Sequence, residues 1–162
     1  MTNLKIRKIT KDEYPVLEDF LYYAIFVPNG VNPPPREIIF EPEIFVYIKD
    51  FGGKDDFCVV AEQDDKIVGA AWARIIPAYG HIDDETPELA ISVLPDWRGQ
   101  GIGSKMMEAL FGLLRERGYK QTSLSVQKNN PALRLYKRLG YKITGEKIDH
   151  AANEDYLMIK TL

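Results

Sequence analysis

The segment from Val93 to Ser104 constrains the fold of this chain most strongly. A short apolar strand enters a turn with glycine at 99, 101 and 103, and an amphipathic helical pattern follows from Ile102 to Arg117. Because the glycines expose the backbone amides of the turn, the amides and the dipole of the helix N-terminus favour an anion such as phosphate. A tight turn that needs glycine only for its dihedral angles is the alternative interpretation.

The two best-known phosphate-binding motifs are absent from this turn and from the rest of the sequence. A P-loop requires Gly-Lys followed by Ser or Thr, whereas the pair Gly53-Lys54 is followed by Asp55. A dinucleotide fingerprint G-x-G-x-x-G that starts at Gly99 would need glycine where Ser104 stands. The sequence therefore excludes P-loop and Rossmann sites.

The remaining elements are indicated by hydrophobic periodicity, caps and turn residues. A capping box of Thr10 and Glu13 begins a helix that Pro28 ends, and residues 63–65 indicate a hairpin turn. The expected strands are 4–9, 57–62, 66–76, 88–93, 122–126, 141–148 and 155–162, and the other expected helices are 42–50, 102–117 and 131–139. This order, β-α-α-β-β-β-α-β-α-β-β, predicts a mixed α/β fold: a central mixed sheet flanked by helices, in one domain over residues 1–162.

The charge of the chain is unevenly distributed. The formal net charge is -3, which does not indicate a nucleic-acid-binding protein. Ten basic residues stand against two acidic ones between Arg98 and Lys142, so this segment carries +8 and the remainder -11. The basic segment raises the question of an anionic ligand, although solvated charge on helical surfaces is the simpler explanation.

Cysteine usage and hydropathy bear on location. The single cysteine, Cys58, allows no intrachain disulfide, which fits a reducing compartment. The first eleven residues lack the apolar core of a signal peptide, and the longest charge-free run, 20–35, is too short to span a bilayer. We therefore expect a soluble cytoplasmic protein that does not bind a membrane. Because Cys58 and the histidines are not at metal-ligand spacing, we expect no metal site.

Two blocks of the sequence resemble the GNAT N-acetyltransferase superfamily. Arg98-x-x-Gly101-x-Gly103 matches the family motif [QR]-x-x-G-x-[GA], and it stands between the fourth expected strand and the third expected helix, as in the family. The segment from Asn129 to Tyr141 resembles the second family pattern, N-x-x-A-x-x-L-Y-x-x-x-G-[FY]. The resemblance is firm from 88 to 143 and weak from 20 to 57, where the family varies most.

This resemblance implies a binding site for acyl-CoA. In relatives the fourth strand separates from the fifth, and its backbone groups pair with the pantetheine arm and polarise the acetyl carbonyl; the matching residues are Ile91, Ser92 and Val93. The pyrophosphate lies on the amides of the motif turn, here Gly99, Gln100, Gly101, Ile102, Gly103 and Ser104. Arg98 either contacts a phosphate or is a solvated charge. Asn129 matches an asparagine that contacts the cofactor arm, and a loop residue without a ligand is the alternative.

The resemblance also implies catalytic residues. Tyr136 matches the tyrosine beside the CoA sulfur, where a phenol can protonate the leaving thiolate; a core aromatic is the alternative reading. The general base is less defined. Glu88 is the leading candidate, followed by His81, Asp83 and Asp84, and a chain of water molecules is an equal alternative.

Together these observations predict an N-acetyltransferase. The expected reaction transfers an acetyl group from acetyl-CoA directly to a primary amine of a small molecule or peptide in a ternary complex, without a metal. The acidic remainder of the chain slightly favours a cationic amine. A noncatalytic acyl-CoA sensor is the alternative from another functional class. Because dimers are common in the family, a homodimer is among the expected states.

Overall fold

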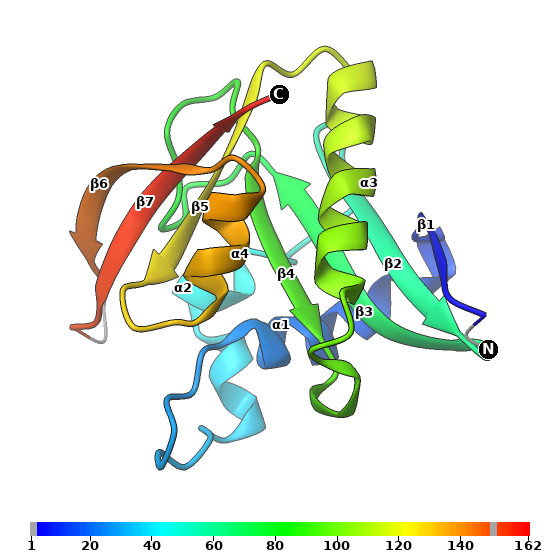
Figure 1. Cartoon of the computed structure of the whole chain (residues 1–162), viewed down its shortest axis with the longest axis horizontal. Coiled ribbons are helices and arrows are strands. Elements are labelled where there is room, and N and C mark those ends of the chain that lie inside the picture. Colours follow the sequence, from blue (N-terminus) through cyan, green and yellow to red (C-terminus); the bar gives the residue numbers. More distant parts are fainter. Residues whose placement is uncertain (1–2, 150–151) are drawn as a thin grey trace.

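The computed structural model describes residues 3–149 and 152–162 (Figure 1). Its elements follow the predicted order of strands and helices, with two additional 3-10 helices and a 3-10 segment at the start of the first helix, so the predicted fold class is confirmed. The strands are β1 Lys5–Lys8, β2 Phe57–Gln63, β3 Lys66–Arg74, β4 Glu88–Val93, β5 Gln121–Gln127, β6 Lys142–Ile148 and β7 Glu154–Thr161. The helices are η1 Lys11–Val16, α1 Leu17–Ala24, η2 Arg36–Phe40, α2 Pro42–Phe45, η3 Pro95–Trp97, α3 Ile102–Glu116 and α4 Ala132–Arg138.

All seven strands form one sheet in the order β1-β2-β3-β4-β5-β7-β6. Neighbouring strands are antiparallel except β4 and β5, which α3 connects as a parallel crossover. The parallel pair is in register only at Glu88 and Ser123. Beyond that pair the two strands diverge, and Figure 1 shows β4 and β5 running apart toward the lower half of the view.

Each face of the sheet is covered by its own hydrophobic core. In β2, Val59 packs toward α3 whereas Cys58 and Val60 pack toward α1, because successive side chains alternate between the faces. Figure 1 shows α3 and α4 in front of the sheet and α1 and α2 behind it. We call these the α3 face and the α1 face. Every strand residue can therefore be assigned to one face by its register.

The first expected helix is shorter than its sequence pattern indicated. Its first part is the 3-10 helix η1, which contains Pro15, and the α-helical part ends at Ala24, four residues before Pro28. Pro15 has no amide to donate to the preceding turn, which disfavours a continuous α-helix there. The predicted capping box is confirmed, because the Glu13 carboxylate accepts the Thr10 amide at 2.9 Å.

The predicted length of the second helix, 42–50, was wrong. Only α2, Pro42–Phe45, is α-helical, and isolated turns follow to residue 50. The guanidinium of Arg74 donates to the carbonyl oxygens of Val46 and Lys49 at 3.0 and 2.8 Å. These carbonyls therefore bond to a side chain from β3 instead of to later helical amides. The sequence pattern also missed η2 altogether.

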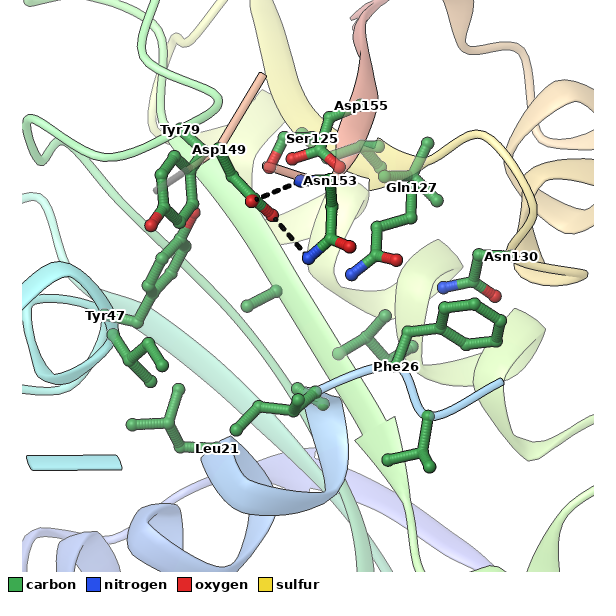
Figure 2. Close-up of a pocket in the computed structure, with 18 of the residues that line it drawn as sticks. Leu21, Phe26, Tyr47, Tyr79, Ser125, Gln127, Asn130, Asp149, Asn153 and Asp155 are labelled. Atoms are coloured by element: carbon green, nitrogen blue, oxygen red, sulfur yellow. Dashed lines mark hydrogen bonds between the residues drawn. The ribbon is translucent and has the colours of Figure 1, made fainter. Parts of the chain in front are cut away.

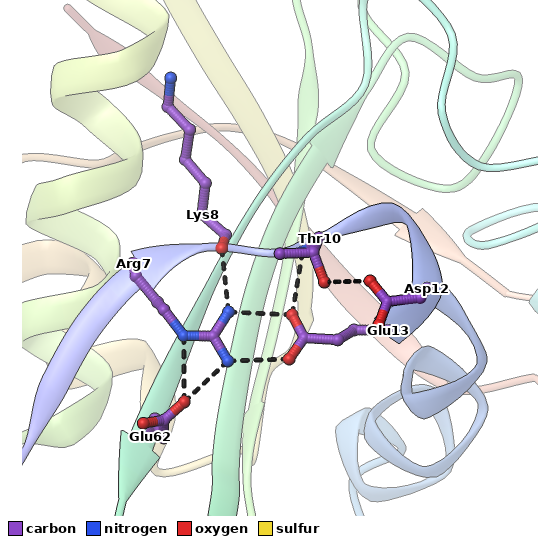
Figure 3. Close-up of polar contacts among 6 residues, drawn as sticks. All are labelled: Arg7, Lys8, Thr10, Asp12, Glu13 and Glu62. Carbon is purple, nitrogen blue, oxygen red and sulfur yellow. Dashed lines mark hydrogen bonds and ion pairs between the residues drawn. The ribbon is translucent and has the colours of Figure 1, made fainter. Parts of the chain in front are cut away.

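An arginine from β1 fixes η1 to the sheet (Figure 3). Arg7 donates through two nitrogens to Glu13, at 2.9 and 2.8 Å, and through two to Glu62 on β2, at 3.1 and 2.8 Å. The hydrogen bonds from Arg7 and Thr10 lower the pKa of Glu13 to about 2. The start of the helical layer is thus tied to β1 and β2 by charge-assisted bonds.

Candidate active site

A cavity of about 410 Å³ occupies the gap where β4 and β5 separate. Its lining includes residues of both faces of the sheet: Leu89, Ile91, Leu124, Val126 and Tyr136 belong to the α3 face, and Glu88, Ala90, Ser125, Gln127 and Asp155 to the α1 face. The cavity therefore passes through the sheet. Two molecules that enter from opposite faces can meet inside it.

The strand residues that line the α3 face of the cavity are apolar, and Tyr136 adds a hydroxyl group there. This residue lies on α4 and is only 9% exposed. Asn130 precedes α4, and its side-chain oxygen accepts the Ala132 amide in the first turn of the helix at 2.9 Å. Burial raises the pKa of Tyr136 to about 12, so the phenol is a proton donor at neutral pH.

The backbone of β4 is open toward the gap. The Leu94 amide donates to Val68 on the β3 side, so by antiparallel alternation Ser92 also bonds to β3. Ile91 and Val93 then direct their amides and carbonyls to the side of β4 away from β3, where the Val93 carbonyl accepts a hydrogen bond from Arg98. The side chain of Ser92 faces away from it and donates to the Phe20 carbonyl at 2.6 Å, which holds α1 against β4.

The glycine-rich turn lies at the same end of β4. Gly99 and Gly101 have φ of +76° and +81°, and a Cβ at either position would meet no atom within 4 Å. The turn is exposed, and Gly101 is the N-cap of the fifteen-residue α3. The space beside these amides is therefore open to a phosphate, and a diphosphate group fits the residues present. Of the other turn residues, Gln100 is exposed, Gly103 and Ser104 are half-buried, and Ile102 is in the core.

The remaining predicted cofactor contacts lie near this end of the gap without lining the cavity. Arg98 is exposed and donates to the carbonyls of Val93 and Tyr23, at 3.0 and 3.3 Å. It therefore links the turn to β4 and to the end of α1. Asn129 is exposed in the turn after β5.

Glu88 lies on the α1 face of the cavity at the only paired position of β4 and β5. Its side chain is buried, and the Tyr47 hydroxyl donates to Oε2. The backbone of Gly80 packs against it so closely that a Cβ there would lie 2.8 Å from Cδ of Glu88. Burial raises the pKa of Glu88 to about 7, and the hydrogen bond from Tyr47 opposes that rise. A carboxyl group with this pKa can exchange a proton near neutral pH.

The other candidate bases are not at the cavity. His81 donates from Nδ1 to the Ile76 carbonyl at 2.9 Å, and Asp83 accepts the Glu85 amide at 2.9 Å. Asp84 lies 3.9 Å from His81 and its side chain is exposed. None of these three lines the cavity. Glu88 alone of the four candidates does.

A second acidic group lies at the β6–β7 end of the cavity. Asp149 accepts the backbone and side-chain amides of Asn153, at 2.9 and 3.2 Å, and Figure 2 shows this pair next to Asp155 and Ser125. Asp155 on β7 is 4% exposed. Burial, together with the charge of Asp149, raises the pKa of Asp155 to about 6.

Comparison with known proteins assigns the family. The model of the acetyltransferase (GNAT) family matches residues 9–141. The chain belongs to the GNAT acetyltransferase family. The predicted resemblance is therefore confirmed over most of the chain, including the region of α1 and α2 where the motifs were weak.

Curated relatives of this GNAT chain match it over part of their length. It is 36% identical over 90 residues to the probable N-acetyltransferase camello of Xenopus laevis, which covers 54% of this chain and 40% of that protein. It is 29% identical over 101 residues to the mycothiol acetyltransferase of Saccharomonospora viridis, which covers 60% of this chain and 33% of that protein. The chain thus spans about a third to two fifths of the length of these relatives.

Solved structures share the whole fold. The ribosomal-protein-S18-alanine N-acetyltransferase of Escherichia coli superposes with a TM-score of 0.68 at 19% identity, over 98% of this chain and 93% of that one. A putative acetyltransferase of Acinetobacter baylyi superposes with a TM-score of 0.74 at 18% identity, over 100% and 94%. At these identities the likeness shows the GNAT fold alone.

Several residues that line the cavity of this GNAT chain were missed by sequence reasoning. Tyr47, Asp149, Asn153 and Asp155 all line the cavity, and none of them stands in a sequence motif that indicates a site. The acidic charge outside the basic segment was the one available signal for the carboxylates. Within residues 3–149 and 152–162, no group of three or more potential metal ligands lies close enough to hold an ion, and no helix is long and apolar enough to cross a membrane.

Proposed function

We propose that this chain transfers an acetyl group from acetyl-CoA to a primary amine in a ternary complex. The observation that carries the proposal is the cavity that passes through the sheet between β4 and β5. A thioester that extends from the turn before α3 along β4 and an amine that enters from the α1 face would meet in this gap. Direct transfer needs no covalent enzyme intermediate in such an arrangement.

The donor site follows from the open backbone. The amides at the start of α3 bind the diphosphate, and the amide and carbonyl of Ile91 and the amide of Val93 pair with the pantetheine arm. An amide from this strand donates to the carbonyl oxygen as negative charge develops on it. Fixed backbone dipoles stabilise this charge without reorganisation.

Proton transfer requires a base and an acid on opposite sides of the acyl carbon. Glu88, on the α1 face, accepts the proton that the amine loses as its nitrogen attacks. Tyr136, on the α3 face, donates its proton to the sulfur as the carbon–sulfur bond breaks. Both residues line the cavity, and the pKa of about 7 for Glu88 and of about 12 for Tyr136 match these roles.

The donor site is tested by a pair of glycine variants. Gly101 and Gly118 both have positive φ and open space at Cβ, but they stand at opposite ends of α3. We expect Gly101→Glu to abolish CoA binding in titration calorimetry, because it places bulk and negative charge where the diphosphate binds. Gly118→Glu, which carries the same backbone strain and charge, should bind CoA as the wild type does. Equal affinity in all three proteins would refute the donor site.

Turnover separates the enzyme from a noncatalytic acyl-CoA sensor. Release of CoA thiol from acetyl-CoA is measured over a panel of primary amines, with acetylated product confirmed by mass spectrometry. The proposed function predicts amine-dependent thiol release. A protein that binds CoA and releases no thiol with any amine would be the sensor, although a buried acid and base at the gap favour the enzyme.

A further inference from the structure

The α1 side of the cavity is acidic. Glu88, Asp149 and Asp155 are in its lining, and no Lys, Arg or His among the described residues lines it. Lys147 and His81 lower the pKa of Glu88 only through their charge, and both lie outside the lining. The net charge at this end of the cavity is therefore negative.

Two of these carboxylates are buried with an oxygen that lacks a partner. Glu88 is 2% exposed and Asp155 is 4% exposed. Within the described part of the chain, Oε1 of Glu88 and Oδ1 of Asp155 accept no hydrogen bond. An unpaired buried carboxylate oxygen is costly, whereas a bound donor with positive charge would satisfy it. Both oxygens thus point to a ligand with cationic N–H groups.

The register of β5 against β7 places the carboxylates of Glu88 and Asp155 a short distance apart. The Tyr47 hydroxyl contacts both Glu88 and Ser125, which places the first carboxylate beside Ser125. Ser125 is paired with Leu157, and Asp155 lies two residues before Leu157 on the same face. Two residues along a strand span about 7 Å and neighbouring strands lie about 5 Å apart. A few methylene groups can bridge this separation.

The cavity walls between these carboxylates and the opening on the α1 face are apolar enough to contact an aliphatic chain. Leu21 and Ile44 line this side, and Figure 2 shows Leu21 and Phe26 opposite the polar side chains of β5 and of the β6–β7 end. A metal ion is a poorer fit, since the described carboxylates and histidines do not gather as a ligand set. The cavity offers two separated anionic points joined by apolar surface.

We propose that the amine acceptor is an aliphatic diamine or a longer polyamine. One amino group faces Glu88 and is acetylated, while a second ammonium group donates to Asp155 near Asp149. This inference rests on the proposed acetyl transfer and names its substrate class. In the reaction the thioester C–S bond breaks and an amide C–N bond forms. Glu88 takes the amine proton, and Tyr136 protonates the sulfur.

The test compares amines that differ only in the second cation. With saturating acetyl-CoA, kcat/KM is measured for 1,4-diaminobutane and 1,5-diaminopentane against butylamine and pentylamine. We expect the diamines to be preferred by about tenfold or more, the usual effect of a hydrogen bond between charged groups. Equal use of diamines and monoamines, or better use of a peptide N-terminal amine, would overturn the inference while the proposed function stands.

A variant locates the second cation. In Asp155→Asn the ratio of kcat/KM between diamine and monoamine should fall toward one, because the amide keeps the size of the side chain and removes its charge. Asp64→Asn, in the turn between β2 and β3, should keep the wild-type ratio. A preference retained in Asp155→Asn would overturn the inference. Thermal unfolding, monitored by circular dichroism, checks that both variants fold. If Asp155→Asn does not fold, the comparison of diamines with monoamines in the wild type decides whether the inference holds.

Binding keeps the inference testable without turnover. If no amine releases thiol, the proposed transfer fails. Calorimetry with 1,4-diaminobutane then still tests the acidic site, and we expect it to bind about tenfold more tightly than butylamine. No excess affinity for the diamine would overturn the inference independently of catalysis.

Discussion

The hydrogen bond from Tyr47 to Glu88 sets the pH range in which the candidate base is ionised. Burial raises the pKa of Glu88 to about 7, and this hydrogen bond lowers it from what burial alone would produce. Tyr47→Phe removes one hydroxyl and leaves the ring in place. Because Glu88 loses a donor to its ionised form, its pKa should rise. Tyr47 thus acts as a positioning residue whose effect appears in a pH profile.

The size of the effect can be worked out from the bond. A hydrogen bond to a charged group contributes about 1.5–3 kcal/mol, and a tenfold change in ionisation corresponds to about 1.4 kcal/mol. The midpoint of the activity profile should therefore rise by about one to two pH units. Near pH 7, where half of Glu88 is ionised in the wild type, activity should fall by about 5- to 50-fold. Near pH 10 the two proteins should differ little.

The assay measures kcat/KM for one amine between pH 5.5 and 10, with release of CoA thiol as the readout. Ionisation of the amine is the same for every protein, so the difference between profiles reports the enzyme. Tyr14→Phe is the matched control, since Tyr14 packs edge-on against Phe51 and does not line the cavity. In a Glu88→Gln background Tyr47→Phe should no longer move the midpoint. If the midpoint of Tyr47→Phe equals that of the wild type, or lies below it, Glu88 is not the titrating base.

Three further substitutions test the chemistry and the packing. Tyr136→Phe should lower kcat about 100-fold, with CoA affinity unchanged in calorimetry. Tyr141→Phe, at a buried neighbour in edge contact with Tyr136, should change neither kcat nor CoA affinity. An equal loss of kcat in the two variants would contradict the acid role of Tyr136. Arg74→Met leaves Asp56, its buried partner at 2.9 Å, without a cation and should lower the free energy of unfolding in urea by about 3–5 kcal/mol. Glu13 has a pKa lowered from 4.5 to about 2, so its contribution is present above pH 4.5 and lost toward pH 2. Glu13→Gln should therefore cost about 1 kcal/mol at pH 7 and nothing near pH 2, and a deficit constant with pH would contradict this.

Local sequence patterns determined the order of the elements and the place of the glycine-rich turn that we propose as the donor side of the site. The turn at Gly99 and Gly101 needs left-handed backbone, and the periodicity of α3 follows immediately, so neighbours along the chain define both. The length of the helix after Pro42 was not predictable, because a side chain from β3, Arg74, takes its carbonyls.

The residues of the proposed acceptor side were brought together by the tertiary structure. The sequence made Glu88 one candidate base among four, and only the register of β4 against β5 places it in the cavity while the other three lie outside. Asp155 reaches the same cavity because β7 inserts between β5 and β6. A local pattern fixes which backbone groups a segment exposes. The energy of a buried carboxylate, and hence its pKa and its need for a cationic partner, depends on neighbours that strand order brings from distant parts of the chain.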